Sequence, residues 1–313
     1  LLGLIVFSTV LDYSVGKAMH RSEDPRTRKL LLLASLGGNL GLPGLFKNVI
    51  IPSGDVLASG TLEARNITVA AQAGLTLAEH ATLNLDGKII LESDATGTAA
   101  FIDHANQQIE AEVQRYLHTG KRFYYLGSPI QHANASIFGQ TDELQGSHDI
   151  YSRFLYHYEN GWQRITEATY GLAPMEGFTF KNPWAGNSYT FSGTLNTGQV
   201  TRNLSHTGWH LLGNPYPSQL DWGMGENPAG WDGHEHLRPS IWYRIGGTGG
   251  QNGGGNFATY NRLTGIGTNG GQRYIPAMQS VWVYAQSPGP ITVGNDARSL
   301  VQADIYKQKP TYK

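Results

Sequence analysis

The sequence predicts an all-β fold: an antiparallel, jelly-roll-like β-sandwich built from two internal repeats, preceded by short β rungs and an apolar N-terminal segment compatible with helix. Three observations predict it. Charged residues make up only 15% of the 313 residues, whereas glycine reaches 40 and aromatic residues 11%, a composition typical of sheets joined by tight turns. Apolar residues alternate with period two from Val49 onwards. Strand-like motifs then recur in the same order in the second half.

The charge balance and the cysteine content bound the class of protein. Lys and Arg number 23 against 24 Asp and Glu, a formal net charge of −1, so the chain lacks the basic footprint of a nucleic-acid-binding protein. Cysteine is absent, which excludes a disulfide framework but suits both a reduced cytoplasm and a bacterial exoprotein. The chain begins without Met and without the order of a signal peptide, so we expect a fragment or a processed product.

Residues 1–47 form a separate apolar leader. Residues 1–11 are nearly all apolar, residues 30–46 carry no charge, and a polar, basic stretch at 20–29 lies between them. Two apolar segments around a basic loop predict a membrane-spanning helical hairpin with its loop on the cytoplasmic side. A pair of buried core helices is the alternative, and the glycines of residues 37–44 disfavour a long helix. We expect membrane contact only through this leader.

Short β rungs are predicted over residues 48–108. Apolar triplets at 67–69, 75–77, 83–85 and 89–91 start at steps of 8, 8 and 6 residues and are separated by small or turn residues. Alternating triplets at this spacing predict consecutive strands, either as a hairpin meander or as a small solenoid. The pattern leaves these two arrangements open.

The second half of the chain contains an internal duplication. The Leu-Gly-x-Pro motif at residues 126–129 returns at 212–215, and the strand-like segment 154–158 returns at 240–244, both at an offset of 86. One copy alone leaves an apolar sheet face uncovered, so we expect the two copies to pack face to face. Leu-Gly-x-Pro itself predicts a strand that ends in a turn, because proline cannot donate to the ladder.

The duplication sets the predicted domain boundaries. Residues 175–180 match 278–283 at an offset of 103, and a glycine-rich insertion near residues 246–255 explains the longer offset. The chain is therefore divided into a leader at 1–47, β rungs at 48–108, a sandwich domain at 109–300 with repeats at about 113–198 and 204–296, and a tail at 301–313.

Tryptophan residues supply the candidate ligand-binding site. Trp184 and Trp231 lie in loop-like sequence, where their rings could stack on sugars or contact another subunit. Asp221 beside Trp222 pairs a carboxylate with an aromatic ring, as glycosidases and sugar-binding modules do. The alternative is that Asp221 binds local backbone N–H groups in a turn while Trp222 packs. Tryptophans inside period-two strands are the candidates for the core: Trp209, Trp242 and Trp282.

A candidate metal site lies at residues 231–236, which contain Asp232, His234 and His236. A His-x-His pair on a strand places both rings on one face, where Zn or a similar metal could bind. The alternative is an exposed polar loop, since no third ligand follows at a defined spacing. The sequence has no nucleophile elbow, zincin motif, dinucleotide fingerprint or EF-hand loop, so we predict no catalytic residue, no cofactor and no enzyme.

A family resemblance rests on residues 208–222, which contain the string Gly-Asn-Pro-Tyr-Pro-Ser-Gln-Leu-Asp-Trp, and on residues 113–117, 123–129 and 191–198. These segments closely resemble a recurring module of large Bacteroidota surface proteins that are exported by the type IX secretion route. The resemblance covers about residues 50–313 and implies secretion and display at the cell surface. From this resemblance we expect a full-length member to carry further β domains and a C-terminal sorting domain as well.

The leader carries a different resemblance. Residues 11–17, 28–32, 39–41 and 45–47 are similar to the early helices of a membrane-bound O-acyltransferase of the alginate-acetylation type. The similarity stops at Asn48 and includes no counterpart of that family's downstream catalytic histidine, so it implies no acyltransferase activity. We interpret the leader as a fused or non-native segment.

These features predict a non-enzymatic, extracellular structural or adhesive module of the bacterial cell surface. Duplicated β units with open sheet edges would allow subunits to join strand to strand into a fibre. A carbohydrate-binding domain of a secreted surface protein is the alternative, and a membrane O-acyltransferase fragment is a remote one. The expected partners are copies of this chain, other surface proteins or glycans, and not nucleic acid.

Overall fold

The computed structural model describes residues 30–33, 48–118, 122–139, 154–182, 186–244 and 257–302. Every regular element in these ranges is a β-strand or a short 3₁₀ turn, which confirms the all-β prediction. Within the same ranges, no helix is long and apolar enough to span a membrane.

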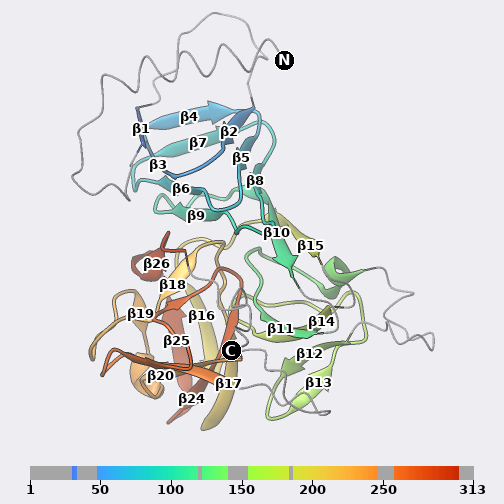
Figure 1. Cartoon of the computed structure of the whole chain (residues 1–313), viewed down its shortest axis with the longest axis vertical. Coiled ribbons are helices and arrows are strands. Elements are labelled where there is room, and N and C mark those ends of the chain that lie inside the picture. The colour runs from blue at the N-terminus through green and yellow to red at the C-terminus, as the bar shows by residue number, and fades with distance from the viewer. Residues whose placement is uncertain are drawn as a thin grey trace, which may run out of the picture.

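Residues 49–103 wind into a parallel β-solenoid, drawn in blue and teal in Figure 1. Its strands form three parallel stacks, β2-β5-β8, β3-β6-β9 and β4-β7. The bounds are β2 (Val49–Ile51), β3 (Asp55–Ser59), β4 (Thr61–Ala64), β5 (Ile67–Val69), β6 (Gly74–Leu77), β7 (Thr82–Leu85), β8 (Ile89–Leu91) and β9 (Ala100–Asp103). The four predicted triplets are therefore successive sides of a coil, and the solenoid alternative is confirmed.

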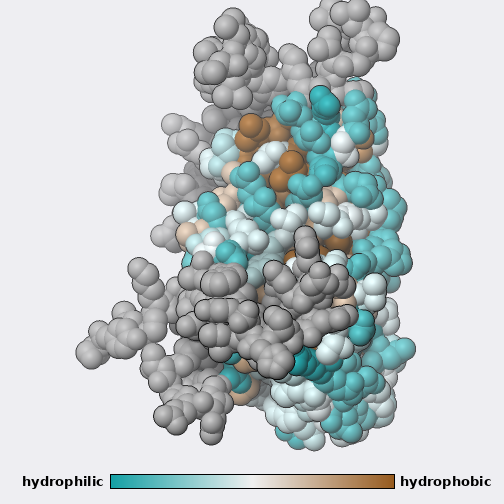
Figure 2. Space-filling view, turned by 90° about the vertical axis from the view of Figure 1, so that its right-hand side faces the viewer, coloured by the Kyte–Doolittle hydropathy of each residue, from teal (hydrophilic) through white to brown (hydrophobic). Residues whose placement is uncertain are grey.

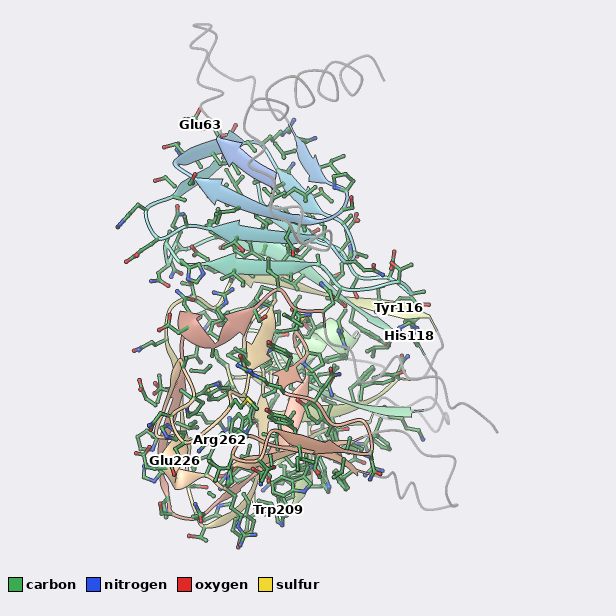
Figure 3. All side chains as sticks on the ribbon, turned by 60° about the vertical axis from the view of Figure 1, so that its left-hand side comes forward. Glu63, Tyr116, His118, Trp209, Glu226 and Arg262 are labelled. Carbon is green, nitrogen blue, oxygen red and sulfur yellow. The ribbon has the colours of Figure 1, made fainter. Side chains whose placement is uncertain are left out.

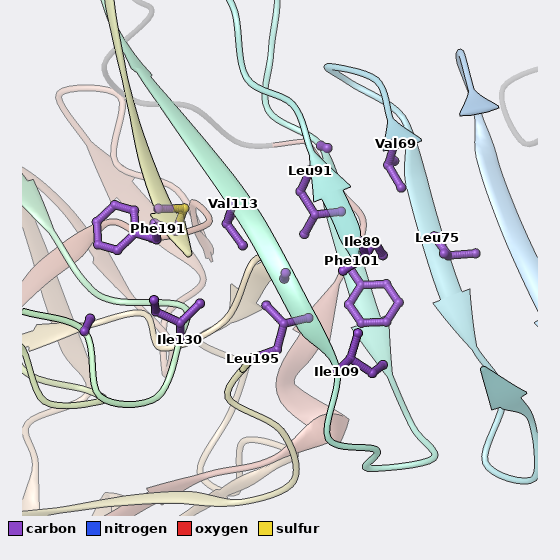
Figure 4. Close-up of a cluster of buried hydrophobic side chains, with 14 of the residues drawn as sticks. Val69, Leu75, Ile89, Leu91, Phe101, Ile109, Val113, Ile130, Phe191 and Leu195 are labelled. Atoms are coloured by element: carbon purple, nitrogen blue, oxygen red, sulfur yellow. The ribbon is translucent and has the colours of Figure 1, made fainter. Parts of the chain in front are cut away.

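The apolar triplets form a solenoid because each short side turns two alternate side chains inward. Parallel pairing places Val49, Ile67 and Ile89 beside one another, so similar residues stack from coil to coil. Ile67, Val69 and Ile89 are completely buried, and Figure 4 shows Ile89 beside Phe101 in this core. Each such side chain stabilises the fold by about 1.5–3 kcal/mol.

Leu30–Leu33 form strand β1, which pairs in parallel with β3 and so adds a strand to the solenoid. The prediction of helix is wrong for these residues, because the edge of β3 supplies partners for their backbone N–H and C=O groups. The rest of the predicted leader lies outside the described residues.

Strand β10 belongs to the solenoid and to the first copy of the duplication. It pairs in parallel with β8 and in antiparallel with β15. Opposite this pair lies a sheet of order β11-β14-β12-β13. The elements of the first copy are β10 (Glu110–Leu117), β11 (Arg122–Leu126), the 3₁₀ turn η1 (Ala135–Phe138), β12 (Phe154–Tyr158), β13 (Trp162–Arg164), β14 (Phe178–Asn182) and β15 (Asn187–Thr194).

The second copy repeats this topology. Its larger sheet has the order β17-β24-β20-β21-β22, and β16-β25 corresponds to β10-β15. Its elements are β16 (Val200–Leu204), β17 (Gly208–Gly213), β18 (Gln219–Asp221), β19 (Trp231–Asp232), η2 (His234–His236), β20 (Ser240–Arg244), β21 (Phe257–Asn261), β22 (Ile266–Thr268), β23 (Tyr274–Ile275), β24 (Ser280–Ala285), β25 (Gly289–Val293), η3 (Asn295–Ala297) and β26 (Arg298–Ser299).

The predicted packing of two copies around one shared interior is wrong. The first copy shares its core with the solenoid, so that Val113 and Phe191 join Ile89 in one cluster (Figure 4). The second copy closes a core of its own, which contains Val283 and Ile291. The reason is the pairing of β10 with β8, which turns the smaller sheet of the first copy into a continuation of the solenoid.

The two copies meet instead at a reciprocal seam made by their Leu-Gly-x-Pro motifs. The Gly127 N–H donates to the carbonyl of Met278 (2.9 Å), and the Gly213 N–H donates to the carbonyl of Met175 (3.0 Å). Met175 and Met278 also share a left-handed backbone, with φ of 58° and 57°. Contacts that occur once in each direction are typical of an isologous interface. The repeated motif therefore joins the copies in addition to ending a strand.

A junction of buried polar groups ties the solenoid to the second copy. Arg298 is buried and donates to the carbonyl of Phe101 (2.7 Å) and to the hydroxyl of Ser218 (3.2 Å), while its guanidinium lies 4.5 Å from the ring centroid of Tyr216. The Phe101 N–H donates to the carbonyl of Pro217 (2.8 Å). Burial lowers the pKa of Arg298 to about 10. The Pro-Tyr-Pro-Ser segment of the family-like string thus holds two parts of the molecule together.

Candidate functional site

The predicted ligand residues Asp221, Trp222 and Trp231 lie together but are committed to structure. Trp222 is 1% and Trp231 5% exposed, and their rings form an edge-to-face pair 4.9 Å apart. The indole N–H of Trp222 donates to the carbonyl of Pro239 (2.9 Å), and that of Trp231 donates to the carbonyl of Asp221 (2.8 Å). The expectation of an exposed Trp231 is wrong because β19 adds to the edge of β25 and turns this ring into the core.

Asp221 has its two carboxylate oxygens occupied. Arg273 donates to both of them at 2.5 Å, and the Gly223 N–H donates to Oδ1 at 2.7 Å. The hydrogen bond to Asp221 raises the pKa of Arg273. This geometry agrees with the turn interpretation of Asp221. Trp184 and the glycine-rich run lie outside the described residues.

The predicted metal ligands do not share a strand face. Asp232 ends β19, Gly233 adopts a left-handed φ of 75°, and His234 and His236 follow in the 3₁₀ turn η2. His234 Nδ1 lies 3.0 Å from the carbonyl of Trp231, and His236 Nδ1 lies 2.8 Å from the hydroxyl of Ser287. The expectation of a strand is wrong, because Gly233 turns the chain where a Cβ would collide with the backbone of Pro290. Over the residues that the structure describes, no group of three or more His, Cys, Asp or Glu gathers to hold a metal.

Ionisable groups of the first copy gather around the buried carboxylate of Glu176. The His157 Nδ1 lies 3.4 Å from Glu176, whose carboxylate also accepts hydrogen bonds from the Tyr170 hydroxyl (3.3 Å) and the Ala173 N–H (3.1 Å). Burial and the nearby Glu176 carboxylate raise the pKa of Tyr170 to about 12. Glu176 precedes β14 at the seam, so this group supports the contact between the copies.

The clearest surface feature is an array of aromatic rings on the outer face of the larger sheets. In β17, β20 and β24 the residues Leu212, Ile241 and Val283 point into the core. Alternate side chains of a strand point to opposite faces, so their neighbours point outward. We call the following residues the aromatic face: Tyr158, Trp162, Trp209, Trp242, Trp282 and Tyr284.

The aromatic face crosses the seam between the copies. Trp282 of the second copy lies 4.6 Å from Tyr158 and 5.6 Å from Trp162 of the first copy, measured between ring centroids. On its other side, Trp209 lies 4.8 Å from Trp242 and 5.3 Å from Tyr284. Trp282 is 8% exposed, whereas Trp162 is 43% and Trp209 41% exposed. A buried ring thus supports two exposed ones, one from each copy.

The place of this face is visible in Figure 3. Trp209 lies at one end of the molecule, and Glu63 of the solenoid lies at the opposite end. The aromatic face is therefore distal to the solenoid.

Two arginine side chains lie over rings of this region. The guanidinium carbon of Arg238 lies 4.0 Å from the ring centroid of Tyr284, and that of Arg244 lies 5.9 Å from the ring centroid of Tyr125. Burial raises the pKa of Tyr125, while Arg244 and Trp282 oppose this shift by stabilising the phenolate. The arrangement combines ring faces with fixed hydrogen-bond donors.

Sequence reasoning assigned Trp209 to the core, and its exposure corrects that assignment. A period-two pattern separates two faces of a strand but does not say which face is covered. The duplication contained a signal for the aromatic face. Phe123 and Tyr156 of the first copy align with Trp209 and Trp242 at the offset of 86, so both copies place aromatic side chains at equivalent positions of equivalent strands.

The comparisons with known proteins identify a family without a described activity. A family model described as a domain of unknown function, DUF8693, matches residues 38–312. No curated protein and no solved structure matches the chain.

Proposed function

This chain belongs to the DUF8693 family, a domain of unknown function, and we propose from its own residues that it is a non-enzymatic adhesive and structural module of an extracellular surface protein. In this function the solenoid and the duplicated β units form one body that presents the aromatic face to a partner. The resemblance to exported Bacteroidota surface proteins supports the extracellular location.

The exposure of Trp162 and Trp209 is the observation that carries the proposal. These large rings are 43% and 41% exposed, and they lie in one continuous array rather than singly. Contiguous exposed aromatic surface is uncommon on soluble proteins and marks sites of interaction, since a ring brings large contact area with little loss of conformational entropy. On the face that Figure 2 shows, strongly hydrophobic side chains form small groups over the upper part, and hydrophilic side chains dominate at the lower right.

The junction supports a role in which the face is held at a fixed distance from the solenoid. Arg298 and the Phe101–Pro217 hydrogen bond connect the last solenoid strand to the second copy, and Thr197 donates to the buried carboxylate of Asp103 at the end of β9 (3.1 Å). Buried polar networks of this kind rigidify a structure because breaking one bond leaves its partner unsatisfied.

Exposed sheet edges favour self-association as one form of adhesion. Strands β13 and β22 each end a sheet, and all their residues are exposed. An unpaired edge can accept a strand from a second copy, which is a direct route to a fibre.

Adhesion is tested with the full chain and with a Trp162→Ala/Trp209→Ala double variant. We expect the wild type to adsorb to bacterial cells or to sediment as an oligomer in analytical ultracentrifugation, and the double variant to lose most of that association. Ile50→Ala is the matched control, because Ile50 is 54% exposed but lies on the solenoid strand β2. A wild type that neither adsorbs nor associates would refute the adhesive function.

A further inference from the structure

We propose that the aromatic face binds an acidic polysaccharide, one rich in uronic acids, with sugar rings stacked on Trp162 and Trp209 and a sugar carboxylate bound by Arg238. This inference rests on the adhesive function proposed above and names the chemistry of the partner.

The geometry of Trp209 leaves ring surface for a ligand. Trp242, Trp282 and Tyr284 all meet Trp209 edge to face, at interplanar angles of 79°, 88° and 89°, so none of these rings is stacked in parallel on it. The flat surface of an indole is apolar, and so is the C–H face of a pyranose ring, whereas the hydroxyl groups of the sugar project sideways. Stacking of a sugar on such a ring removes apolar area from water without desolvating the hydroxyls.

The array is extended, which suits a chain ligand better than a single sugar. Ring contacts run from Trp162 through Trp282 to Trp209 and on to Tyr284, with centroid separations of 5.6, 6.4 and 5.3 Å. The two exposed rings of this array, Trp162 and Trp209, belong to different copies. A polymer can contact both rings at once, and the second contact is then intramolecular and gains effective concentration.

The positive charge of Arg238 favours an acidic polymer as the ligand. Arg238 is exposed, lies 4.0 Å over the ring of Tyr284, and forms no ion pair with any residue that the structure describes. The planar guanidinium binds a carboxylate with two parallel hydrogen bonds, and stacking on the tyrosine fixes its orientation beforehand.

No acidic side chain opposes this charge on the described strands of the second copy's larger sheet. The outward positions of β17, β20, β21 and β24 carry the following residues: Trp209, Leu211, Gly213, Ser240, Trp242, Arg244, Phe257, Thr259, Asn261, Ser280, Trp282 and Tyr284. The whole chain has a net charge of −1, so the two arginines Arg238 and Arg244 beside these rings are a local feature and not a general excess of basic residues; the exposed acidic residues next to the face along the chain are Glu159 and Glu235.

The test is a titration of the full chain, followed by tryptophan fluorescence, with polygalacturonate, neutral dextran and single-stranded DNA. We expect saturable quenching by polygalacturonate that weakens as salt is raised, because the contact to Arg238 is ionic. Loss of one stacking ring in Trp209→Ala should weaken binding roughly ten- to a hundredfold, and Arg238→Ala about tenfold. Arg65→Ala is the charge control, since Arg65 is exposed on the solenoid, and it should bind like the wild type.

The outcomes separate this inference from the adhesive function. Equal binding of dextran, or of DNA, would overturn the acidic-sugar inference while adhesion to cells stands. Polygalacturonate binding that survives Trp209→Ala and Trp162→Ala would place the site elsewhere and overturn it as well. If no polysaccharide binds but the protein self-associates through Trp209, the aromatic face is an interface between copies. If the protein also neither adsorbs to cells nor associates with itself, both proposals are refuted.

Discussion

Alanine at position 213 tests the seam between the two copies. A Cβ on Gly213 would lie 2.8 Å from the Cα of Gly127 and still closer to the carbonyl oxygen of Glu176. Both neighbours are backbone atoms, so no side chain can swing aside to make room. The copies must separate locally, which also stretches the hydrogen bonds from Gly127 to Met278 and from Gly213 to Met175.

The size of the effect follows from these contacts. Overpacking of this kind costs about 1–3 kcal/mol, and two backbone hydrogen bonds contribute about 1 kcal/mol each, so Gly213→Ala should lower the free energy of unfolding by roughly 3–5 kcal/mol. Urea unfolding followed by tryptophan fluorescence measures it. Gly171→Ala is the control, because a Cβ at Gly171 meets nothing within 4 Å, and it should stay within about 0.5 kcal/mol of the wild type.

A second variant keeps the test decisive if Gly213→Ala does not fold. Gly127→Ala places its Cβ 2.8 Å from both the carbonyl oxygen of Asn214 and the Cα of Gly213, and so strains the seam from the other copy. Unfolding free energies within about 0.5 kcal/mol of the wild type for both variants would show that the copies are not close-packed at this seam.

Three further predictions concern ionisable groups. Burial raises the pKa of Tyr216 from 10.0 to about 12, so its neutral hydroxyl stabilises the fold below about pH 10, and this contribution is lost as the pH rises to about 12. Tyr216→Phe should reduce the loss of stability between about pH 10 and about pH 12, measured by urea unfolding. Burial lowers the pKa of His210 from 6.5, so stability should fall as the pH drops below about 6.5, and His210→Gln should flatten that fall in thermal unfolding scans. Asp221→Asn should cost about 1–2 kcal/mol by weakening the pair with Arg273, yet leave polygalacturonate binding unchanged in the fluorescence titration.

Much of the local structure could be predicted from sequence because it depends on neighbours along the chain. The triplets that begin at Ile67, Leu75, Leu83 and Ile89 all lie in strands, since alternating apolar side chains suit one buried and one open face. The duplication was also readable, because equivalent strands keep their motifs, and the left-handed Met175 and Met278 occupy matching positions.

The exposure of the candidate site could not be predicted, because it depends on what covers each face of a sheet. Trp231 lies in a loop-like segment, yet its strand pairs with β25 and is buried; Trp209 lies in a regular strand, yet its outer face is open. The residues that decide whether each ring is covered lie far from it in the sequence.

Alternation and turn motifs along the chain were therefore enough to place the rung strands between residues 67 and 91, to show that a four-strand order is repeated, and to show that Leu-Gly-x-Pro recurs at the end of a strand. Pairing between distant segments settled the rest: that the rungs pair in parallel as a solenoid, that the first copy shares the solenoid core, and that two glycines meet at a seam. Alternation and turn chemistry act between residues a few positions apart, whereas hydrogen-bond partners and covered faces, as for β8 with β10, are set by segments distant in sequence.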